Sequence, residues 1–417
     1  MHTKPESYDP RSLGFSTQRL AAIPEEMQKY IDSGDLSGMV TLIWRRGAIA
    51  QMNVLGSRSV ADKLSMERDT LFRIASMTKP VTSVAAMMLI EEGRLKLDDP
   101  IKRWLPEFAD MRVLTAPNGP AEATVPAARD ITVDDLFTHR GGLAYAFTSI
   151  GPIAKVMEER LPPGLTPDAW LAALGTIPLS YQPGERFHYS HSTDVLGFLV
   201  ARIAGTSLRD HLRARIFEPL RMRDTDFWIA PENRRRAAVV YRPDAQSGQL
   251  LPVPFPEHDS PPAFSSGGGG LVSTADDYLR FARLLLNGGG LDGVQLLRGE
   301  SVALMARNRL TDTQRQIPFM GIPFWAGQGF GLGLSVITDP DKQAWMGPGS
   351  KGAFGWPGAF GTWWQADPVN DMVLIYMIQN SLPLGPEMAA LLATGQRLGA
   401  RMALPLFQRL VHEAIAG

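Results

Sequence analysis

The sequence predicts an α+β fold, in which an antiparallel sheet flanked by helices carries a second, mainly helical domain. Strand-forming runs gather near the two ends of the 417-residue chain, whereas the middle is rich in proline and in helical segments. Hydrophobic residues make up 44% and charged residues 20%, a balance typical of globular proteins with a large buried core. We therefore expect residues 12–93 and 235–417 to form the α/β domain and residues 94–234 the helical domain.

The overall charge and composition exclude several classes of function. With 42 Lys and Arg residues against 43 Asp and Glu residues, the net charge of −1 gives no electrostatic case for binding nucleic acid. The absence of cysteine rules out disulfides, thiolate nucleophiles and Cys-ligated metals. Residues 1–14 lack the apolar stretch of a secretory signal, and the most apolar run, residues 81–90, is too short to span a membrane. We expect a cytoplasmic protein that binds no membrane.

The N-terminal segment predicts one amphipathic helix followed by paired strands. Ser16 is a plausible helix cap, and apolar residues then recur at helical spacing until Gly34. Residues 39–44 and 48–55 are two runs of strand formers joined by a turn, which predicts an antiparallel hairpin. Residues 71–75 would form a third, short strand.

Two helices and a second hairpin are expected farther along. Residues 76–92 form a mostly apolar stretch with Pro80 in its first turn, which predicts a helix inside the protein. Residues 273–287 predict a helix capped near Thr274. Residues 360–366 and 372–379 predict a strong hairpin, and a last helix is expected to start near Pro386.

Ser76 and Lys79 supply a candidate nucleophile and base. Residues i and i+3 share a helix face, so the amine of Lys79 can lie beside the hydroxyl of Ser76. Of the nine lysines in the chain, only Lys79 has a serine three residues before it. Ser76 could instead be a helix cap and Lys79 a surface charge. The helix that follows is too apolar for a surface element, however, so the amine is expected at the mouth of a buried segment.

Two further segments could complete such a site. Tyr189 follows a turn at residues 182–185 that would present its phenol on a loop, and a tyrosine and a lysine can share the base role toward a serine. The glycines between residues 355 and 361 would let a backbone N–H approach a ligand closely, as an oxyanion hole requires. Taken alone, Tyr189 could be a core aromatic residue and the glycine segment an edge strand with bulges.

In order and spacing, these segments resemble the S-x-x-K, Y-x-N and K-T-G elements of serine β-lactamases and penicillin-binding proteins, in particular the class C branch. Residues 136–143, 216–222 and 269–274 resemble that branch as well, so the resemblance spans residues 13–381. It implies a β-lactamase/D,D-peptidase-like fold with the active site between the two domains.

The second and third elements depart from the family pattern. Where class C β-lactamases carry Lys-Thr-Gly, this chain has Trp356-Pro357-Gly358, and where they carry the Asn of the second element it has His191. In the family, that Lys and Thr hold the carboxylate of a β-lactam or a peptide terminus, so their replacement removes the anionic anchor. A Trp at this place is similar to family VIII carboxylesterases, which the chain resembles most closely.

The resemblance also implies a role for each catalytic residue. Ser76 would be the nucleophile, and Lys79 and Tyr189 the coupled base. The backbone N–H groups of Ser76 and Ala359 would form the oxyanion hole, because Ala359 takes the place of the residue just after the K-T-G glycine.

Substrate binding is expected to fall to the third element and to His191. Trp356, Gly358 and Phe360 would help line a largely apolar cleft. His191 would orient the leaving group or Lys79, although a histidine hydrogen-bonded within a loop is an equally good reading. His139 belongs to a segment that is a structural turn in the family, so we do not assign it to a Ser-His-Asp triad. No spacing typical of a metal site occurs, and no cofactor is expected.

Together these observations predict a serine esterase. We expect it to cleave small carboxylic esters with short to medium acyl chains through an acyl-enzyme on Ser76. A β-lactamase or D,D-peptidase, and an acyltransferase that uses the same acyl-enzyme, remain alternatives. A catalytically silent binding paralogue is a more remote one, because such a protein has no chemical need to keep Ser76, Lys79 and Tyr189 together.

Overall fold

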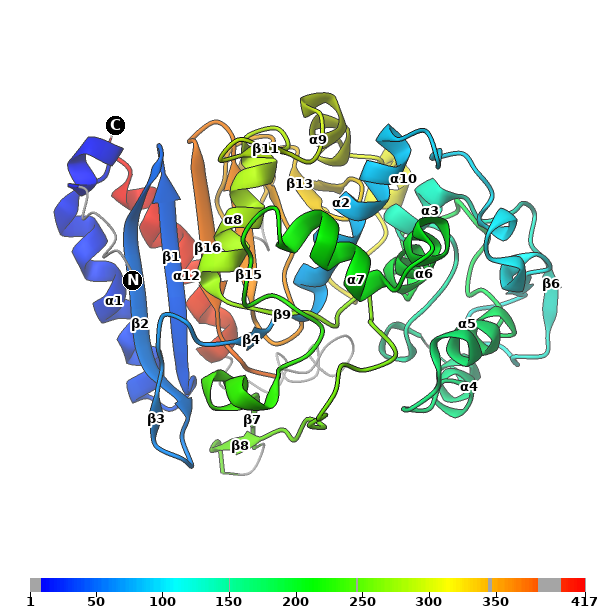
Figure 1. The fold of residues 1–417 in the computed structure, drawn as a ribbon, viewed down its shortest axis with the longest axis horizontal. Coiled ribbons are helices and arrows are strands. Elements are labelled where there is room, and N and C mark those ends of the chain that lie inside the picture. The colour runs from blue at the N-terminus through cyan, green and yellow to red at the C-terminus, as the bar shows by residue number, and fades with distance from the viewer. Residues whose placement is uncertain (1–8, 150, 245–246, 344–346, 382–398, 417) are drawn as a thin grey trace.

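The computed structural model describes residues 9–149, 151–244, 247–343, 347–381 and 399–416. One large sheet separates two helical layers, and most of the remaining helices gather beyond one of them (Figure 1). None of the helices in the described ranges is long and apolar enough to cross a membrane.

The main sheet is built from both ends of the chain. Among the described residues it has eight strands in the order β12-β13-β14-β15-β16-β1-β2-β3, and every neighbouring pair is antiparallel. The strands are β1 (Gly38–Arg45), β2 (Ala48–Ser59), β3 (Leu64–Ser65), β12 (Gln328–Phe330), β13 (Ser335–Ile337), β14 (Phe354–Gly355), β15 (Trp363–Asp367) and β16 (Met372–Met377). The centre of the sheet joins the two ends, because Val40 of β1 pairs with Met377 of β16. The predicted fold class is therefore confirmed.

The two faces of the sheet bury two different cores. Side chains alternate along a strand, so Val373, Ile375 and Met377 of β16 face one core while Leu374 and Tyr376 face the other. The first core is covered by α2 (Thr78–Glu91) and α8 (Ala275–Leu286), and the second by α1 (Thr17–Asp32) and α12 (Gly399–Ala414), as Figure 1 shows. The site described below lies where α2 meets the sheet.

The predicted helices around the sheet form with the expected caps. The Ser16 hydroxyl accepts a hydrogen bond from the Arg19 N–H at the start of α1, and the Thr274 hydroxyl accepts one from the Asp277 N–H at the start of α8. These bonds occupy N–H groups that have no partner within the helix. The helix start predicted near Pro386 falls on residues that lie outside the described ranges.

The middle of the chain carries most of the other helices. In the described part of the chain, the other α-helices are α3 (Val133–Phe137), α4 (Pro152–Arg160), α5 (Pro167–Gly175), α6 (Ser192–Ala204), α7 (Leu208–Leu212), α9 (Gly299–Met305) and α10 (Asp312–Arg315). Short 3-10 turns are η1 (Pro10–Leu13), η2 (Ala75–Met77), η3 (Ile101–Arg103), η4 (Pro106–Phe108), η5 (Ala146–Thr148), η7 (Pro231–Arg236) and η8 (Pro340–Lys342), and η6 (Arg213–Phe217) is a π-helical turn. Small two-stranded ribbons pair β4 (Phe72–Arg73) with β9 (Val272–Ser273), β5 (Arg112–Leu114) with β6 (Thr124–Pro126), β7 (Tyr241–Pro243) with β8 (Leu250–Pro252) and β10 (Gly290–Leu291) with β11 (Val294–Gln295). The boundaries assigned above to the two domains remain a prediction.

Two predicted strands differ from those observed. The strand expected at residues 71–75 is limited to β4, which pairs with β9 outside the main sheet, because the chain turns into η2 at Ala75. The strand expected from residue 360 begins only at Trp363. Residues before it form a tight turn, in which the Gly358 N–H donates to the Thr362 carbonyl and the Gly361 N–H to the Gly358 carbonyl.

Candidate active site

Ser76 lies in a strained turn at the start of the buried helix α2. The preceding residue, Ala75, has a φ of 44°, which an L-residue with a β-carbon rarely adopts. The turn is held on the other side by the Ile74 N–H, which donates to the Leu271 carbonyl. Ser76 itself is partly exposed and lines the pocket, and the N–H groups at a helix start have no acceptor within the helix. The turn thus presents both a hydroxyl and a free backbone N–H to a ligand.

The amine of Lys79 is completely buried and points to the Ser76 hydroxyl. Lys79 has no exposed surface, and its Nζ lies 3.2 Å from the Oγ of Ser76. Two other oxygens surround it: the Gly268 carbonyl at 2.6 Å and the Tyr145 hydroxyl at 3.2 Å. A buried amine needs such partners, since burying a charge or a polar group without them is costly. The i, i+3 spacing that placed the two side chains on one helix face is therefore realised in the structure.

Asp194 lies behind this cluster, in the first turn of α6. It is only 4% exposed, and each carboxylate oxygen accepts two hydrogen bonds. Burial opposes its ionisation, but the hydrogen bond and charge of His191, together with the charge of Lys79 and a hydrogen bond from Ser266, lower the pKa of Asp194 to about 2. The site therefore contains a carboxylate that stays charged at neutral pH.

Tyr145 is a second phenol in the site. Its hydroxyl lies between Lys79 and Asp194, and its distance to the Asp194 carboxylate is 3.5 Å. Burial, followed by the negative charge of Asp194, raises the pKa of Tyr145 well above its usual value. Tyr145 is therefore a neutral phenol that donates toward Asp194 and accepts from Lys79.

Tyr189 contacts Lys79 through its ring and Trp356 through its hydroxyl. The Nζ of Lys79 lies 4.6 Å from the ring centroid of Tyr189. The indole N–H of Trp356 donates to the Tyr189 hydroxyl at 3.0 Å. An indole nitrogen can only donate, so the Tyr189 oxygen accepts this bond and its own O–H proton is left to face another group. The hydroxyl bonded directly to Lys79 is thus that of Tyr145.

The turn after Trp356 is pressed against the strained turn before Ser76. A β-carbon added to Gly358 would lie 2.4 Å from the Ile74 carbonyl oxygen and 2.1 Å from the Thr362 hydroxyl. That hydroxyl in turn donates to the Ile74 carbonyl at 3.2 Å. Only glycine allows two backbones to approach so closely. Ala359, the next residue, lines the same pocket as Ser76, which puts both predicted oxyanion donors on one cavity.

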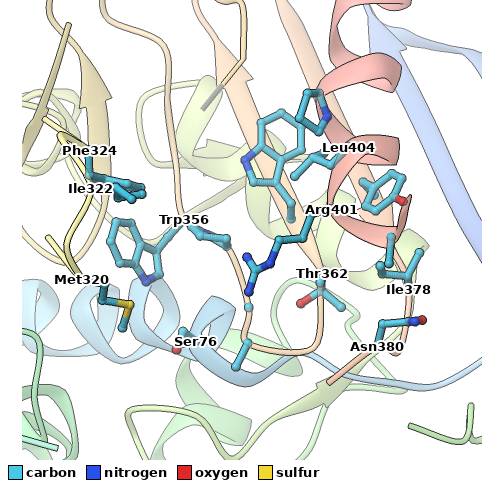
Figure 2. A pocket seen from close by; sticks show the side chains of 18 of the residues that line it. Ser76, Met320, Ile322, Phe324, Trp356, Thr362, Ile378, Asn380, Arg401 and Leu404 are labelled. Atoms are coloured by element: carbon cyan, nitrogen blue, oxygen red, sulfur yellow. The ribbon is translucent and has the colours of Figure 1, made fainter. Parts of the chain in front are cut away.

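The pocket has a volume of ≈ 340 Å³ and is mostly apolar. Figure 2 shows Ser76 at its floor, with Met320, Ile322, Phe324 and Trp356 along one side. Arg401 and Leu404 of α12 lie on the opposite side, so the pocket also contains one guanidinium among the described lining residues. Burial lowers the pKa of Arg401 from its usual value. The cleft is therefore less uniformly apolar than the sequence indicated.

Two residues predicted to bind substrate lie away from the described pocket lining. The ring of Phe360 packs against Phe255, with ring centroids 5.4 Å apart. His191 is the residue before α6, where its Nδ1 lies 3.0 Å from the Asp194 carboxylate and its ring contacts those of Tyr145 and Trp170. Any influence of His191 on Lys79 would therefore pass through Asp194.

His139 is a packing residue in this arrangement. It is fully buried, and its ring lies 4.8 Å from that of Tyr189. Its Nδ1 accepts from the Ser190 N–H, so it supports the loop that carries Tyr189. Burial and the charge of Lys79 hold the pKa of His139 well below its usual value, so the ring is neutral.

Sequence reasoning missed three contributors to the site: Tyr145, Asp194 and the Gly268 carbonyl. The sequence near each of them carried a signal that could have pointed to it. Tyr145 follows residues 136–143, and Gly268 precedes residues 269–274, two segments that had already been matched to the class C branch. Asp194 lies three residues after His191, on the same helical face. None of these signals specifies contact with Lys79, which only the fold creates.

Comparison with known proteins places the chain in a family. The family model described as Beta-lactamase matches residues 23–396. The chain belongs to the β-lactamase family. Its fold is that of β-lactamase-like serine hydrolases, a group that includes esterases and acyltransferases. The resemblance inferred from the three sequence elements is thereby confirmed at the level of this superfamily.

Three relatives show the range within the β-lactamase family. Protein Rv1367c of Mycobacterium tuberculosis (strain ATCC 25618 / H37Rv) is 50% identical over 391 residues, which cover 93% of this chain and 97% of that protein. Esterase EstB of Burkholderia gladioli is 31% identical over 392 residues, or 87% and 91% of the two chains. The solved structure of "EstCE1, a hydrolase with promiscuous acyltransferase activity" superposes with a TM-score of 0.75 at 26% identity, covering 93% of this chain and 99% of that one.

Proposed function

We propose that the protein hydrolyses small carboxylic esters through an acyl-enzyme on Ser76. The observation that carries the proposal is the 3.2 Å contact between the buried amine of Lys79 and the Ser76 hydroxyl at the floor of a mostly apolar pocket. A serine needs an adjacent base to act as a nucleophile, and this arrangement supplies one. Similarity to an esterase of Burkholderia gladioli over most of both chains supports the same reaction class.

Acylation would begin with attack of the Ser76 oxygen on the ester carbonyl. Lys79 takes the hydroxyl proton as the new C–O bond forms, and the backbone N–H groups of Ser76 and Ala359 stabilise the negative oxygen. Tyr189 lines the pocket beside Lys79 and shares the role of general base with it. The proton then passes to the leaving alkoxide, the C–O bond of the ester breaks, and the alcohol departs.

Deacylation would repeat these steps with water. A water molecule attacks the acyl-enzyme carbonyl, its proton passes to the same base, and the Ser76 oxygen leaves with a proton restored to it. The carboxylic acid is released and the enzyme returns to its starting state. No metal or cofactor takes part in this scheme.

The pocket lining supports neutral esters with apolar acyl groups as substrates. Trp356 donates to Tyr189 at the position where class C β-lactamases carry a lysine, so a neutral donor replaces an ammonium group there. Phe147 and Met402 are exposed apolar residues that also line the pocket. Apolar walls with few polar groups favour substrates whose surface is likewise apolar.

The first test compares the wild-type protein with Ser76→Ala. We expect the wild type to release p-nitrophenol from p-nitrophenyl butyrate and Ser76→Ala to release none above background, while a chromogenic cephalosporin is cleaved slowly or not at all. Rapid cephalosporin cleavage would favour the β-lactamase alternative. Ester turnover that survives in Ser76→Ala would contradict the proposal.

The role of Tyr189 has its own test. Tyr189→Phe removes the hydroxyl that accepts from Trp356 and keeps the ring beside Lys79. We expect a fall in kcat and a change in the pH dependence of kcat/KM, because this hydroxyl shares the base role. Full activity with an unaltered pH profile would remove Tyr189 from the mechanism.

Acyl transfer is a second candidate reaction of the same acyl-enzyme. The name of EstCE1 describes a hydrolase with promiscuous acyltransferase activity, and this chain shares its fold over nearly its whole length. An alcohol that enters the pocket in place of water would accept the acyl group. Ester turnover in the presence of increasing 1-butanol, with butyl butyrate measured by gas chromatography, gives the ratio of transfer to hydrolysis.

A further inference from the structure

Asp194 lies at the centre of a buried network that ends at Lys79. Its Oδ1 accepts from the Gly268 N–H at 2.9 Å and from the Ser266 hydroxyl at 2.6 Å. Its Oδ2 accepts from His191 Nδ1 at 3.0 Å and, over a longer 3.5 Å, from the Tyr145 hydroxyl. A carboxylate offers about four lone-pair directions, and here each has a partner. The side chain is therefore fixed from four sides.

Besides Ser76, two residues bond to the Lys79 amine, and Asp194 contacts both of them. The Lys79 amine donates to the carbonyl of Gly268 and to the hydroxyl oxygen of Tyr145. Asp194 binds the N–H of that same Gly268 and the O–H of that same Tyr145. One carboxylate thus sets the position of both fixed acceptors of the amine.

The donor and acceptor roles in these hydrogen bonds determine which group the lone pair of the amine faces. A carbonyl oxygen can only accept, and a Tyr145 hydroxyl that donates to Asp194 presents its lone pairs to Lys79. Two N–H bonds of the amine are therefore directed away from the nucleophile. The remaining position faces the Ser76 hydroxyl at 3.2 Å, where a neutral amine holds its lone pair.

We propose that Asp194 is a positioning residue for the base, which aims the lone pair of Lys79 at Ser76 through Tyr145 and Gly268. The proposal rests on the proposed function only in taking Lys79 as the base. It also gives His191 a definite task. His191 and Ser266 hold Asp194, so His191 acts at the far end of the network and makes no contact with the leaving group.

Gly268 and its neighbour Gly269 offer a test by substitution that removes no hydrogen-bonding group. A β-carbon added to Gly268 would lie 2.8 Å from Asp194 Oδ2 and 2.9 Å from the Tyr145 hydroxyl oxygen, so these two groups must move. A β-carbon added to Gly269 would lie 3.8 Å from its nearest neighbour, the carbonyl carbon of Ala75, which is ordinary contact. Gly268→Ala and Gly269→Ala are therefore a matched pair within one loop.

Asp194→Asn is the direct test, because the amide has nearly the same shape. Its NH₂ group donates where the carboxylate accepted. When this NH₂ group faces Tyr145, it donates to the phenol oxygen, and the phenol O–H then turns toward Lys79. There the phenol proton competes with Ser76 for the lone pair of the amine. Asp277→Asn is the matched control, since Asp277 on helix α8 is also a buried carboxylate and accepts from the Asp224 N–H and the Thr225 hydroxyl.

Two kinetic measurements should be made on each variant. One is the rate of Ser76 labelling by a fluorophosphonate probe, which requires the nucleophile but no ester substrate. The other is kcat and KM with p-nitrophenyl butyrate from pH 5 to 10. Labelling separates this inference from the proposed function, because a wild type that is labelled at Ser76 but hydrolyses no ester would contradict only the latter.

We expect Asp194→Asn to lower the labelling rate and kcat about 100-fold with KM changed less than about threefold, the loss typical of a misplaced catalytic group. Gly268→Ala should be slow, whereas Gly269→Ala and Asp277→Asn should stay within about threefold of the wild type.

Tyr145→Phe completes the test. Because Asp194 acts through Tyr145, Asp194→Asn combined with Tyr145→Phe should be no slower than Asp194→Asn alone. Losses that add in full, or an Asp194→Asn variant with a wild-type labelling rate and kcat, would overturn the proposal. If Asp194→Asn does not fold, as judged by circular dichroism, the glycine pair decides, and equal rates for Gly268→Ala and Gly269→Ala would overturn it.

Discussion

Trp356 shows how one side chain can determine the chemistry of a pocket position. Its indole is 2% exposed and donates to the Tyr189 hydroxyl, so it supplies a hydrogen bond without a positive charge. The aromatic cluster around it includes Phe324 and Phe330, whose ring centroids lie 6.1 and 5.0 Å from that of Trp356. The residue therefore shapes the pocket and orients the phenol at the same time.

Trp356→Phe should separate these two roles. The phenyl ring keeps most of the packing but cannot donate to Tyr189, so we expect kcat with p-nitrophenyl butyrate to fall about tenfold, as loss of one neutral hydrogen bond predicts. KM should change less. Trp325→Phe is the control, since Trp325 packs in the same cluster against Phe187. Equal effects of the two substitutions would assign Trp356 to packing alone.

Gly358 provides a second prediction at the residue scale. A methyl group at this position meets the Ile74 carbonyl, so Gly358→Ala must push the turn that carries Ala359 away from Ser76. Loss of one oxyanion-hole donor typically costs 100- to 1000-fold in kcat, and we expect a fall of about 100-fold. Gly299→Ala is the control, because its nearest neighbour would be 3.9 Å away. Wild-type kcat in Gly358→Ala would argue against Ala359 as an oxyanion donor.

At the scale of elements, local patterns were predicted and long-range pairings were not. The β1–β2 hairpin and the capped helix α8 follow from alternation and capping within a few residues. Strands β12 to β14 contain only two or three residues each, and β12 and β14 each include a glycine, so no alternation marks them. They exist because neighbouring strands of the sheet supply hydrogen bonds to them.

Helix α12 packs on the sheet and also lines the pocket, so it affects both the stability of the sheet and the shape of the pocket. Phe407 faces the sheet, where it is fully buried with its ring 5.7 Å from that of Tyr376. Arg401 and Leu404 of the same helix line the pocket. Any shift of α12 on the sheet therefore changes the wall opposite Trp356.

Phe407→Ala should weaken this element. Removing a buried phenyl ring costs about 3–5 kcal/mol of unfolding free energy, which urea denaturation followed by circular dichroism can measure. Arg409→Ala, on the exposed side of α12, should change the unfolding free energy by less than about 0.5 kcal/mol. A Phe407→Ala variant as stable as the wild type would show that α12 contributes little to the second core.

The whole molecule should lose stability in mild acid. His188 is half-buried, and desolvation followed by the charge of Arg186 lowers its pKa from 6.5 to about 4. The unfolded chain therefore binds this proton near pH 6.5, whereas the folded protein binds it only near pH 4. The stability contributed by the neutral ring is complete above pH 6.5 and is lost as the pH falls toward 4.

His188→Gln tests this linkage. Between pH 7 and pH 4.5 the variant should lose less unfolding free energy than the wild type, by at most about 3 kcal/mol. Urea denaturation at several pH values measures the difference. The exposed His258→Gln should follow the wild-type curve. A His188→Gln curve parallel to that of the wild type would contradict the assignment.

The sequence predicts the site only as far as local geometry reaches. Ser76 and Lys79 could be paired because one helix carries both. The two distant partners of Lys79 come from the residue before η5 and from the glycine segment before β9, and Asp194 of α6 bonds to both. No spacing in the chain relates these segments to α2. Their convergence is a property of the whole fold.

The pairing of Val40 with Met377 also bears on how the protein is made. At about 5–20 residues per second, a ribosome needs roughly 20–70 s to reach β16 after completing β1. During that interval β1 has an open edge, and for most of it neither Trp356 nor Ala359 has been synthesised. The nascent chain thus already contains Ser76 and Lys79 but cannot assemble the oxyanion hole, which delays the reactive centre until the segment with Ala359 has been made.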